Sequence, residues 1–197
     1  MPKVVDHEER RTELAAAVWR LASREGLEAV TVRRVAEEAG WSTGAVVHYF
    51  ADKDDLLLFA FSTVADRVRI RLANSAEHTA EPLELARAWL IEALPIDKEQ
   101  QAEVRVWFAF LGLALTRPAF ARAQRLTYRA WRGRVADLLR EAQERGDIRA
   151  DVDPSAAAAA LVAVVDGLSI QATFEPRALS AKRQTELVDR QLDALRP

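Results

Sequence analysis

The chain has 197 residues, half of them hydrophobic and 29% charged, which is the composition of a globular protein with room for one or two domains. It contains no cysteine, which excludes disulfides, thiolate metal sites and thiol redox chemistry and agrees with a reducing cytoplasm. The net charge is −2, and the first 56 residues hold eight Lys or Arg against eleven Asp or Glu, so any DNA contact must come from a local patch.

Seven Gly, seven Pro and the lack of strand-like alternation favour an all-α fold. No apolar run reaches about 18 residues, and the N-terminal residues lack an apolar stretch. We therefore expect no transmembrane helix, no signal peptide and a cytoplasmic protein. The first predicted helix spans residues 7–25 and ends at Gly26. Its apolar stripe at helical spacing consists of Leu14, Ala17, Val18, Leu21 and Ala22.

Residues 29–58 predict two short helices joined by a tight turn and followed by the start of a longer helix. Thr31 can cap the first short helix, and Gly40 can end it in a left-handed conformation. Ser42 or Thr43 can cap the second. Neither short helix is stable alone, so both must pack on the helix before them. This arrangement matches a helix-turn-helix, whose second helix enters the major groove of DNA.

The rest of the chain predicts further helices of a separate body. A long helix from about residue 53 to about residue 73 leads out of the motif, and residues 74–82 break the periodicity. Five more helices are then expected, at about residues 83–94, 97–115, 119–145, 155–174 and 181–195. The total is about nine helices, three or four of them in an N-terminal head.

The segment TVRRVAEEAGWSTGAVVHYFADKDDLL, residues 31–57, resembles the DNA-binding segment of the TetR family of bacterial transcriptional regulators. The features that carry the resemblance are the Thr31 start, the AEEAG turn, the Ser-Thr-Gly opening of the next helix, the His-Tyr-Phe triplet and Lys53. Within the family, STGAVVHYFADKDDLL is similar to the subgroup that includes choline-responsive repressors of the betaine pathway. The remaining chain agrees in length, helix count and the connector at residues 146–154. The resemblance implies a helix-turn-helix domain over residues 1–56 and an effector-binding and dimerisation domain over residues 57–197.

The resemblance also implies which residues contact DNA. Those expected to face the major groove are Thr43, Gly44, Val47 and His48. Those expected at phosphates are Thr31, Arg33, Ser42, Tyr49 and Lys53, and Arg34 is a further candidate for contact with DNA.

Each of these residues also has an ordinary structural interpretation. Thr31 and Ser42 would cap helices in any protein, and Tyr49 would serve in a core. Arg34 would pair with Glu37 or Glu38 on an exposed helix face. His48 has no His, Asp or Cys at metal-ligand spacing, so we expect no metal there; a solvated surface is its alternative role.

Between the head and the last two helices lie several large aromatic side chains. In the resembled family this region holds a ligand pocket, and we place it among Trp89, Glu103, Trp107, Phe110, Tyr128 and Trp131. Aromatic rings beside a carboxylate suit an organic cation. The arginines at positions 122, 125, 129 and 132 share one helix face, which is solvated or else favours an anion. The polarity of the ligand stays open, and for any one aromatic residue a role in the core is the alternative.

The last two helices are the expected dimer interface, as in the resembled family. Half of a four-helix bundle would be formed by Ala157, Leu161, Val164, Leu168, Val188, Leu192 and Leu195. Burial of these residues within one protomer is the alternative.

These features predict a homodimeric transcriptional repressor that a small molecule releases from a palindromic operator. A regulator with the same head and a body that binds a protein partner is the second hypothesis. An enzyme is not expected, because the sequence offers no Ser–His–Asp set, metal cluster or phosphate loop and only three histidines. We expect no cofactor and no membrane partner.

Overall fold

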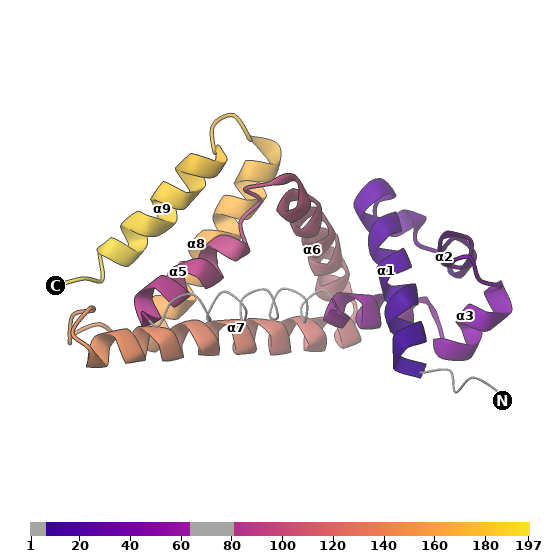
Figure 1. Ribbon diagram of the computed structural model, residues 1–197, viewed down its shortest axis with the longest axis horizontal. Helices are drawn as coiled ribbons and strands as arrows, with labels where there is room; N and C mark the ends of the chain where they lie inside the picture. The colour runs from indigo at the N-terminus through magenta and orange to yellow at the C-terminus, as the bar shows by residue number, and fades with distance from the viewer. Residues whose placement is uncertain (1–6, 64–80) are drawn as a thin grey trace. The chain divides into compact units, whose positions relative to one another are not determined.

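The computed structural model describes residues 7–63 and 81–197, and in these two ranges the chain is helical without a strand (Figure 1). The all-α prediction is confirmed, and the described ranges contain nine α-helices. One of them begins at residue 53 and is described to residue 63; its predicted continuation to residue 73 lies outside the described residues. The others are α1 (His7–Glu25), α2 (Val32–Ala39), α3 (Thr43–Tyr49), α5 (Pro82–Glu92), α6 (Lys98–Thr116), α7 (Pro118–Glu144), α8 (Pro154–Phe174) and α9 (Ala181–Asp193).

The helix boundaries follow local signals of the sequence. The Thr31 hydroxyl accepts a hydrogen bond from the amide of Arg34, and Gly40 ends α2 with a φ of 72°. The hydroxyl of Ser42, and not of Thr43, caps α3 by accepting from the amide of Ala45. The predicted break at residues 74–82 lies almost entirely outside the described residues.

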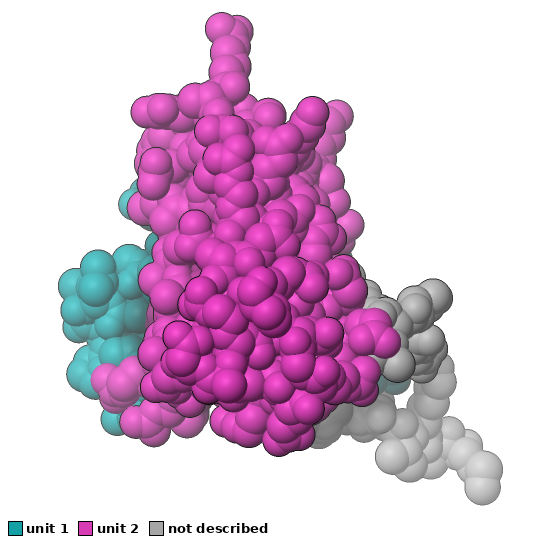
Figure 2. All heavy atoms as spheres, turned by 90° about the vertical axis from the view of Figure 1, so that its left-hand side faces the viewer, with its two compact units in different colours: residues 1–67, 106–123 teal, residues 68–105, 124–197 magenta. Residues whose placement is uncertain are grey.

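The chain divides into two compact units, one of residues 1–67 and 106–123 and the other of residues 68–105 and 124–197 (Figure 2). This division by packing does not coincide with the predicted domains, residues 1–56 and 57–197. The end of α6 and the start of α7 belong to the first unit. The predicted domains separate DNA binding from effector binding and dimerisation. This functional division stays a prediction.

The core of the first unit is built on α1. Leu14 and Leu21 of that helix are fully buried together with Val35 of α2 and Val46 of α3. Such burial supplies most of the stability that two short helices lack by themselves.

Aromatic rings extend the core of the first unit towards residues 106–123. The ring of Phe61 stacks on Phe110 with centroids 3.6 Å apart and on Trp107 with centroids 5.1 Å apart. Phe110 also contacts Phe120, which is fully buried. These contacts place the end of α6 in the first unit.

The core of the second unit joins residues 124–144 of α7 to α5, α8 and α9. Helices α5, α8 and α9 pack against one another (Figure 1). An ion pair between Arg87 of α5 and Asp189 of α9, at 2.6 Å, borders this core. Asp153 caps α8 by accepting from the amides of Ser155 and Ala156.

Among the described residues, α8 alone is long and apolar enough by length and composition to cross a membrane, with a mean hydropathy of 1.6. The core helix of a soluble protein meets the same criterion. Here α8 buries Leu161, Val165 and Ala172 in the core of the second unit, which accounts for its apolar composition without a membrane.

Candidate nucleic-acid interface and effector region

The second helix of the motif presents one exposed face. All four residues predicted to face the groove, Thr43, Gly44, Val47 and His48, are exposed, whereas Val46 on the opposite face is fully buried. Val47, a large apolar side chain, is 55% exposed. A side chain of this kind can meet a thymine methyl group, while Thr43 and His48 can exchange hydrogen bonds with base edges.

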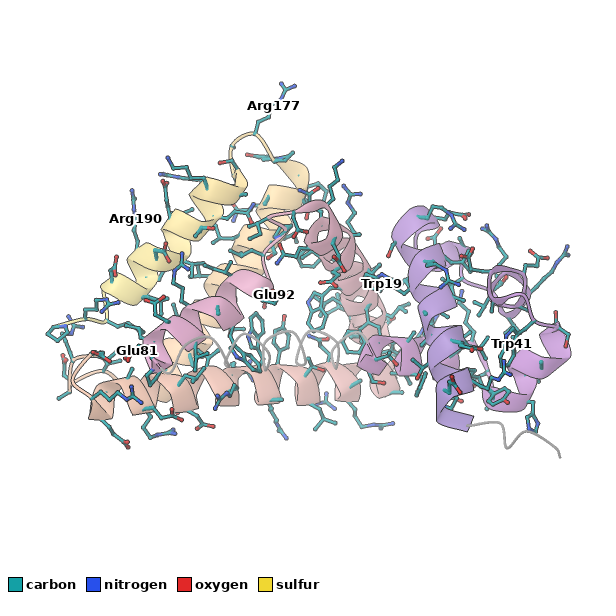
Figure 3. The ribbon with its side chains drawn as sticks, viewed as in Figure 1. Trp19, Trp41, Glu81, Glu92, Arg177 and Arg190 are labelled. Carbon is teal, nitrogen blue, oxygen red and sulfur yellow. The ribbon has the colours of Figure 1, made fainter. Side chains whose placement is uncertain are left out.

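A surface hollow of about 410 Å³ lies beside this face, lined by Arg10, Trp41, Ser42, Ala45, His48 and Tyr49. The guanidinium carbon of Arg10 lies 5.0 Å from the centre of the Trp41 ring. Tyr49 contacts Trp41 and His48 edge to face, with ring centres 5.6 and 5.5 Å apart. Trp41 lies between α2 and α3 (Figure 3). The hollow therefore combines a cation, hydroxyl groups and aromatic edges, which suits a sugar-phosphate backbone.

Arg10 and Trp41 are not among the DNA contacts predicted from the sequence. No local signal points to Arg10, because it lies on α1 and reaches the hollow only when α1 packs against the motif. Trp41 directly precedes Ser42, the cap of α3. This position beside the predicted DNA-contacting helix is the one sequence signal for Trp41 as a DNA contact.

The predicted phosphate contacts are accessible to different degrees. Thr31 and Ser42 are exposed, and Tyr49 and Lys53 are half-buried. The Arg33 side chain is 82% exposed and pairs with Glu37 at 2.9 Å. An ion pair this exposed contributes little free energy, so a phosphate can replace Glu37.

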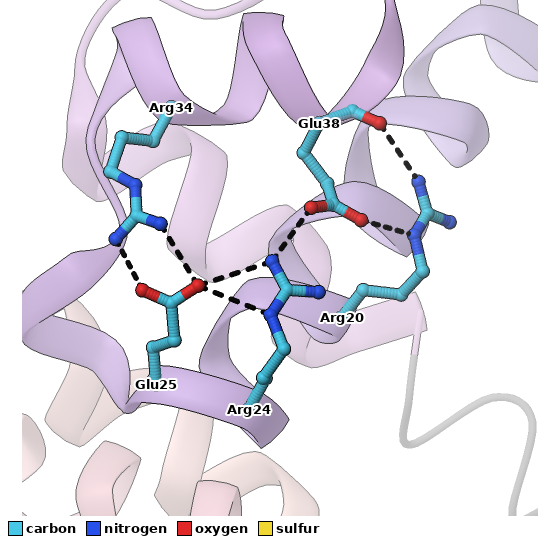
Figure 4. Close-up of polar contacts among 5 residues, drawn as sticks. All are labelled: Arg20, Arg24, Glu25, Arg34 and Glu38. Atoms are coloured by element: carbon cyan, nitrogen blue, oxygen red, sulfur yellow. Dashed lines mark hydrogen bonds and ion pairs between the residues drawn. The ribbon is translucent and has the colours of Figure 1, made fainter.

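Arg34 belongs to a network of five charged residues that links α1 to α2 (Figure 4). Its guanidinium donates to both carboxylate oxygens of Glu25, at 2.5 and 2.9 Å. Arg24 bridges Glu25 and Glu38, and Arg20 donates to Glu38 at 2.8 Å. The predicted pairing of Arg34 with Glu37 or Glu38 is wrong, because the end of α1 brings Glu25 closer. To contact DNA, the Arg34 side chain would have to break its hydrogen bonds to the Glu25 carboxylate.

Hydrogen bonds within this network shift the pKa values of its members. The bond from Arg34 lowers the pKa of Glu25, and those from Arg24 and Arg20 lower the pKa of Glu38. The charged form of both glutamates is therefore favoured by their arginine partners.

Comparison with known proteins agrees with this geometry. Residues 14–59 match "Bacterial regulatory proteins, tetR family", and residues 82–197 match "BetI-type transcriptional repressor, C-terminal". The chain belongs to the TetR family. It is a transcriptional regulator and not an enzyme. Regulators of this family bind DNA and small-molecule effectors, are typically dimers and are soluble cytoplasmic proteins.

Three relatives illustrate the similarity to TetR-family members. The HTH-type transcriptional regulator PksA of Bacillus subtilis (strain 168) is 32% identical over 196 residues, which cover 99% of this chain and 94% of PksA. The crystal structure of a transcriptional regulator from Rhodococcus sp. Rha1 has a TM-score of 0.82 at 32% identity and covers 94% of this chain and 95% of that one. A putative regulator from Saccharomonospora viridis, solved in complex with choline, has a TM-score of 0.86 at 25% identity, with 94% and 96% coverage.

The predicted effector residues of this TetR-family chain fall into both units. Trp107 and Phe110 lie in the first unit, and Phe110 is only 3% exposed within its aromatic core. The second unit holds Trp89, Glu103, Tyr128 and Trp131, all half-buried. The structure brings Phe110 and Trp107 together through Phe61, which agrees with the alternative role of these two residues in a core.

Tyr128 has a carboxylate partner that the sequence did not reveal. Its hydroxyl donates to Oδ2 of Asp166 on α8 at 2.6 Å. Burial raises the pKa of both groups, and the hydrogen bond to Asp166 raises that of Tyr128 further. Asp166 interrupts the apolar residues of α8, and this was the one sequence signal for it.

Most of the residues predicted for the dimer interface of a TetR-type bundle face the protomer's own core. Leu161, Leu168, Val188 and Leu192 are at most 9% exposed within the second unit, and Ala157, Val164 and Leu195 are half-buried. This agrees with the alternative that these side chains are buried within one protomer. The outer face of α8 instead carries Ala156, Ala160, Ala163, Ile170 and Phe174, all exposed.

Among residues 7–63 and 81–197, no group of three or more His, Cys, Asp or Glu residues is arranged to hold a metal ion.

Proposed function

We propose that this chain is a homodimeric repressor that binds a palindromic operator in the cytoplasm and releases it when a small molecule binds its C-terminal domain. The observation that carries the DNA-binding part is the exposed α3 face of Thr43, Gly44, Val47 and His48 next to the hollow at Arg10. The match of residues 82–197 to a BetI-type repressor domain supports the repressor role. The choline complex of the similar Saccharomonospora viridis protein supports a small-molecule effector.

In the proposed complex, one set of residues contacts the base edges of the operator and another contacts its sugar-phosphate backbone. The α3 face reads bases in the major groove, while Arg10, Arg33, Ser42 and Tyr49 hold the sugar-phosphate backbone. One such helix reads only a half-site of a few base pairs. Two copies related by a twofold axis therefore read a palindrome with half-sites about one helical turn apart.

The outer face of α8 supplies the surface for a second copy. Phe174 is 79% exposed and Ile170 44%, and the alanines at positions 156, 160 and 163 follow on the same face. Small side chains let a partner helix approach closely, and the two large ones gain burial on association. This face replaces the inward-facing leucines in the proposed interface.

Release requires only that the effector binds one arrangement of the dimer better than the operator-bound one. A ligand with equal affinity for both arrangements would not change operator occupancy. The proposal therefore needs an effector whose affinity falls when operator is bound.

The test is a genome-wide footprint of the purified protein, followed by measurement of operator affinity for Thr43→Ala and His48→Ala. Each substitution is expected to weaken specific binding by about 1–3 kcal/mol while non-specific binding changes less. Arg140→Ala, an exposed position on α7, is the matched control and should bind as the unaltered protein does. Full specific affinity in both α3 variants would refute the proposed readout. An operator released by a protein partner and by no small molecule would favour the second hypothesis.

A further inference from the structure

Trp41 lies in the turn between α2 and α3, and backbone hydrogen bonds hold the chain there. The amide of Trp41 donates to the carbonyl of Ala36 at 2.8 Å, and the amide of Gly40 donates to that of Glu37 at 3.3 Å, which is the pairing of a Schellman motif. Directly after Trp41, the hydroxyl of Ser42 caps α3. The half-buried indole also packs against the core of the first unit. The position of this ring is therefore fixed by the fold itself.

The Trp41 ring contacts two residues that come from different helices. Arg10 of α1 places its guanidinium carbon 5.0 Å from the centre of the ring. Tyr49, the last residue of α3, meets the ring edge to face with centres 5.6 Å apart. All three side chains line the hollow of about 410 Å³ beside the exposed face of α3. One indole thus contacts two of the residues proposed to hold the sugar-phosphate backbone.

The ring contact positions Arg10 without using its hydrogen-bond donors. A guanidinium carries its N–H groups in its own plane, and a cation over an aromatic face is attracted by the ring electrons and not by an acceptor atom. The carboxylate of Glu13 accepts from Nη1 of Arg10 at 3.3 Å, but this ion pair is exposed and holds the side chain weakly. The Trp41 ring can therefore fix the guanidinium while its N–H groups bind a phosphate.

We infer that Trp41 is a positioning residue for operator binding, whose indole holds Arg10 and Tyr49 where the sugar-phosphate backbone passes. Trp41 acts through these two side chains and reads no base. Contacts to phosphates fix the register and orientation of a protein on DNA, so the ring also influences how α3 enters the major groove. The inference rests on the proposed function and adds to it a residue that determines the strength of the backbone contacts.

Packing of the turn is the competing explanation for Trp41. An apolar side chain such as leucine would also cover the core between α2 and α3. It would not hold a guanidinium, because an aliphatic side chain has no π-face. The two explanations therefore differ in what happens to Arg10 when the indole is replaced.

The test is a double-mutant cycle of Trp41→Leu and Arg10→Gln in DNA binding. Fluorescence anisotropy of the full-length protein would use a labelled duplex of unrelated sequence at low salt and the operator found by footprinting. Each single variant is expected to bind about tenfold more weakly, and the double variant less than about threefold more weakly than either. Trp41→Leu should also lower the slope of log affinity against log salt as much as Arg10→Gln does. Losses that simply multiply, or an unchanged slope in Trp41→Leu, would overturn the inference.

Further variants separate positioning from packing. Trp41→Phe keeps a π-face and should keep the slope and bind within about threefold of the unaltered protein; a slope as low as that of Arg10→Gln would refute the role of the ring. Trp19→Phe makes the same replacement at a half-buried tryptophan of α1 outside the hollow and is the matched control, with unchanged binding expected. Circular dichroism and thermal unfolding show whether each variant is folded. Should Trp41→Leu fail to fold, Trp41→Met takes its place under the same expectations, because the longer, flexible side chain fills more of the same space.

Operator specificity of the unaltered protein is measured apart from the cycle. Specific binding together with losses that multiply would leave the proposed repressor function standing and remove only this inference. An unaltered protein that prefers no operator over the unrelated duplex would remove the proposed function, whatever the cycle gives.

Discussion

Asp54, in the first turn of the helix that begins at residue 53, forms an ion pair with Arg117 at the junction of α6 and α7. The guanidinium carbon of Arg117 also lies 5.6 Å from the centre of the Phe120 ring. Both side chains of the pair are more than 40% exposed, so solvent screens the attraction. We predict that a double-mutant cycle of Asp54→Asn and Arg117→Gln gives a coupling free energy below about 1 kcal/mol in urea unfolding. A coupling well above that value would show that this pair is a principal link within the first unit.

The hollow at Arg10 leads to a prediction about salt dependence. If Arg10 neutralises a phosphate, Arg10→Gln lowers affinity equally for operators of different sequence. It also reduces the slope of log affinity against log salt by about one for each protomer. Glu13, which lies 3.3 Å from Arg10 on an exposed helix face, does not hold the side chain firmly. Fluorescence anisotropy over a salt series measures both quantities, with Arg140→Gln as the control. An unchanged slope would remove Arg10 from the interface.

The local signals of the head were sufficient to predict its structure from the sequence. Thr31, Gly40 and Ser42 act on backbone groups within four residues, so their roles do not depend on the rest of the chain. The helical periodicity of residues 43–48 also places Thr43, Gly44, Val47 and His48 on one exposed face of α3.

The outward face of α8 could not be predicted in this way. Apolar residues surround the helix, and two of its polar residues, Asp166 and Ser169, do not lie on the side that faces solvent, so polarity does not indicate the outward side. Packing against α5 and α9 decides that Leu161 points inward and Phe174 outward. Likewise, Arg10 reaches the hollow and Asp166 reaches Tyr128 only through contacts between helices far apart in the chain.

The charged network between α1 and α2 predicts a specific acid sensitivity. The pKa values of Glu25 and Glu38 are lowered by their arginine partners. A lowered pKa contributes stability above the unfolded-state value, about 4.3, and this contribution is lost as the pH falls through the folded-state value. Glu38→Gln should therefore reduce stability near neutral pH and flatten its decline below about pH 5. Thermal unfolding at a series of pH values measures this, with Glu141→Gln as a variant that removes the same charge outside the network. A decline as steep as that of the unaltered protein would contradict the role of Glu38.

The exposed face of α8 gives the prediction that decides the oligomeric state. Phe174→Glu places a charge where a partner helix would bury an apolar ring, and Ala160→Glu adds bulk where close approach is required. Each is expected to sediment as a monomer in analytical ultracentrifugation and to bind the full palindrome no better than one half-site. Leu115→Glu alters an 87% exposed leucine of the first unit and is the matched control, because it adds the same charge at a residue outside α8. This variant should remain a dimer with full operator affinity. If both α8 variants stay dimeric and the control does not, the two copies associate through the first unit, and the proposed α8 interface is wrong.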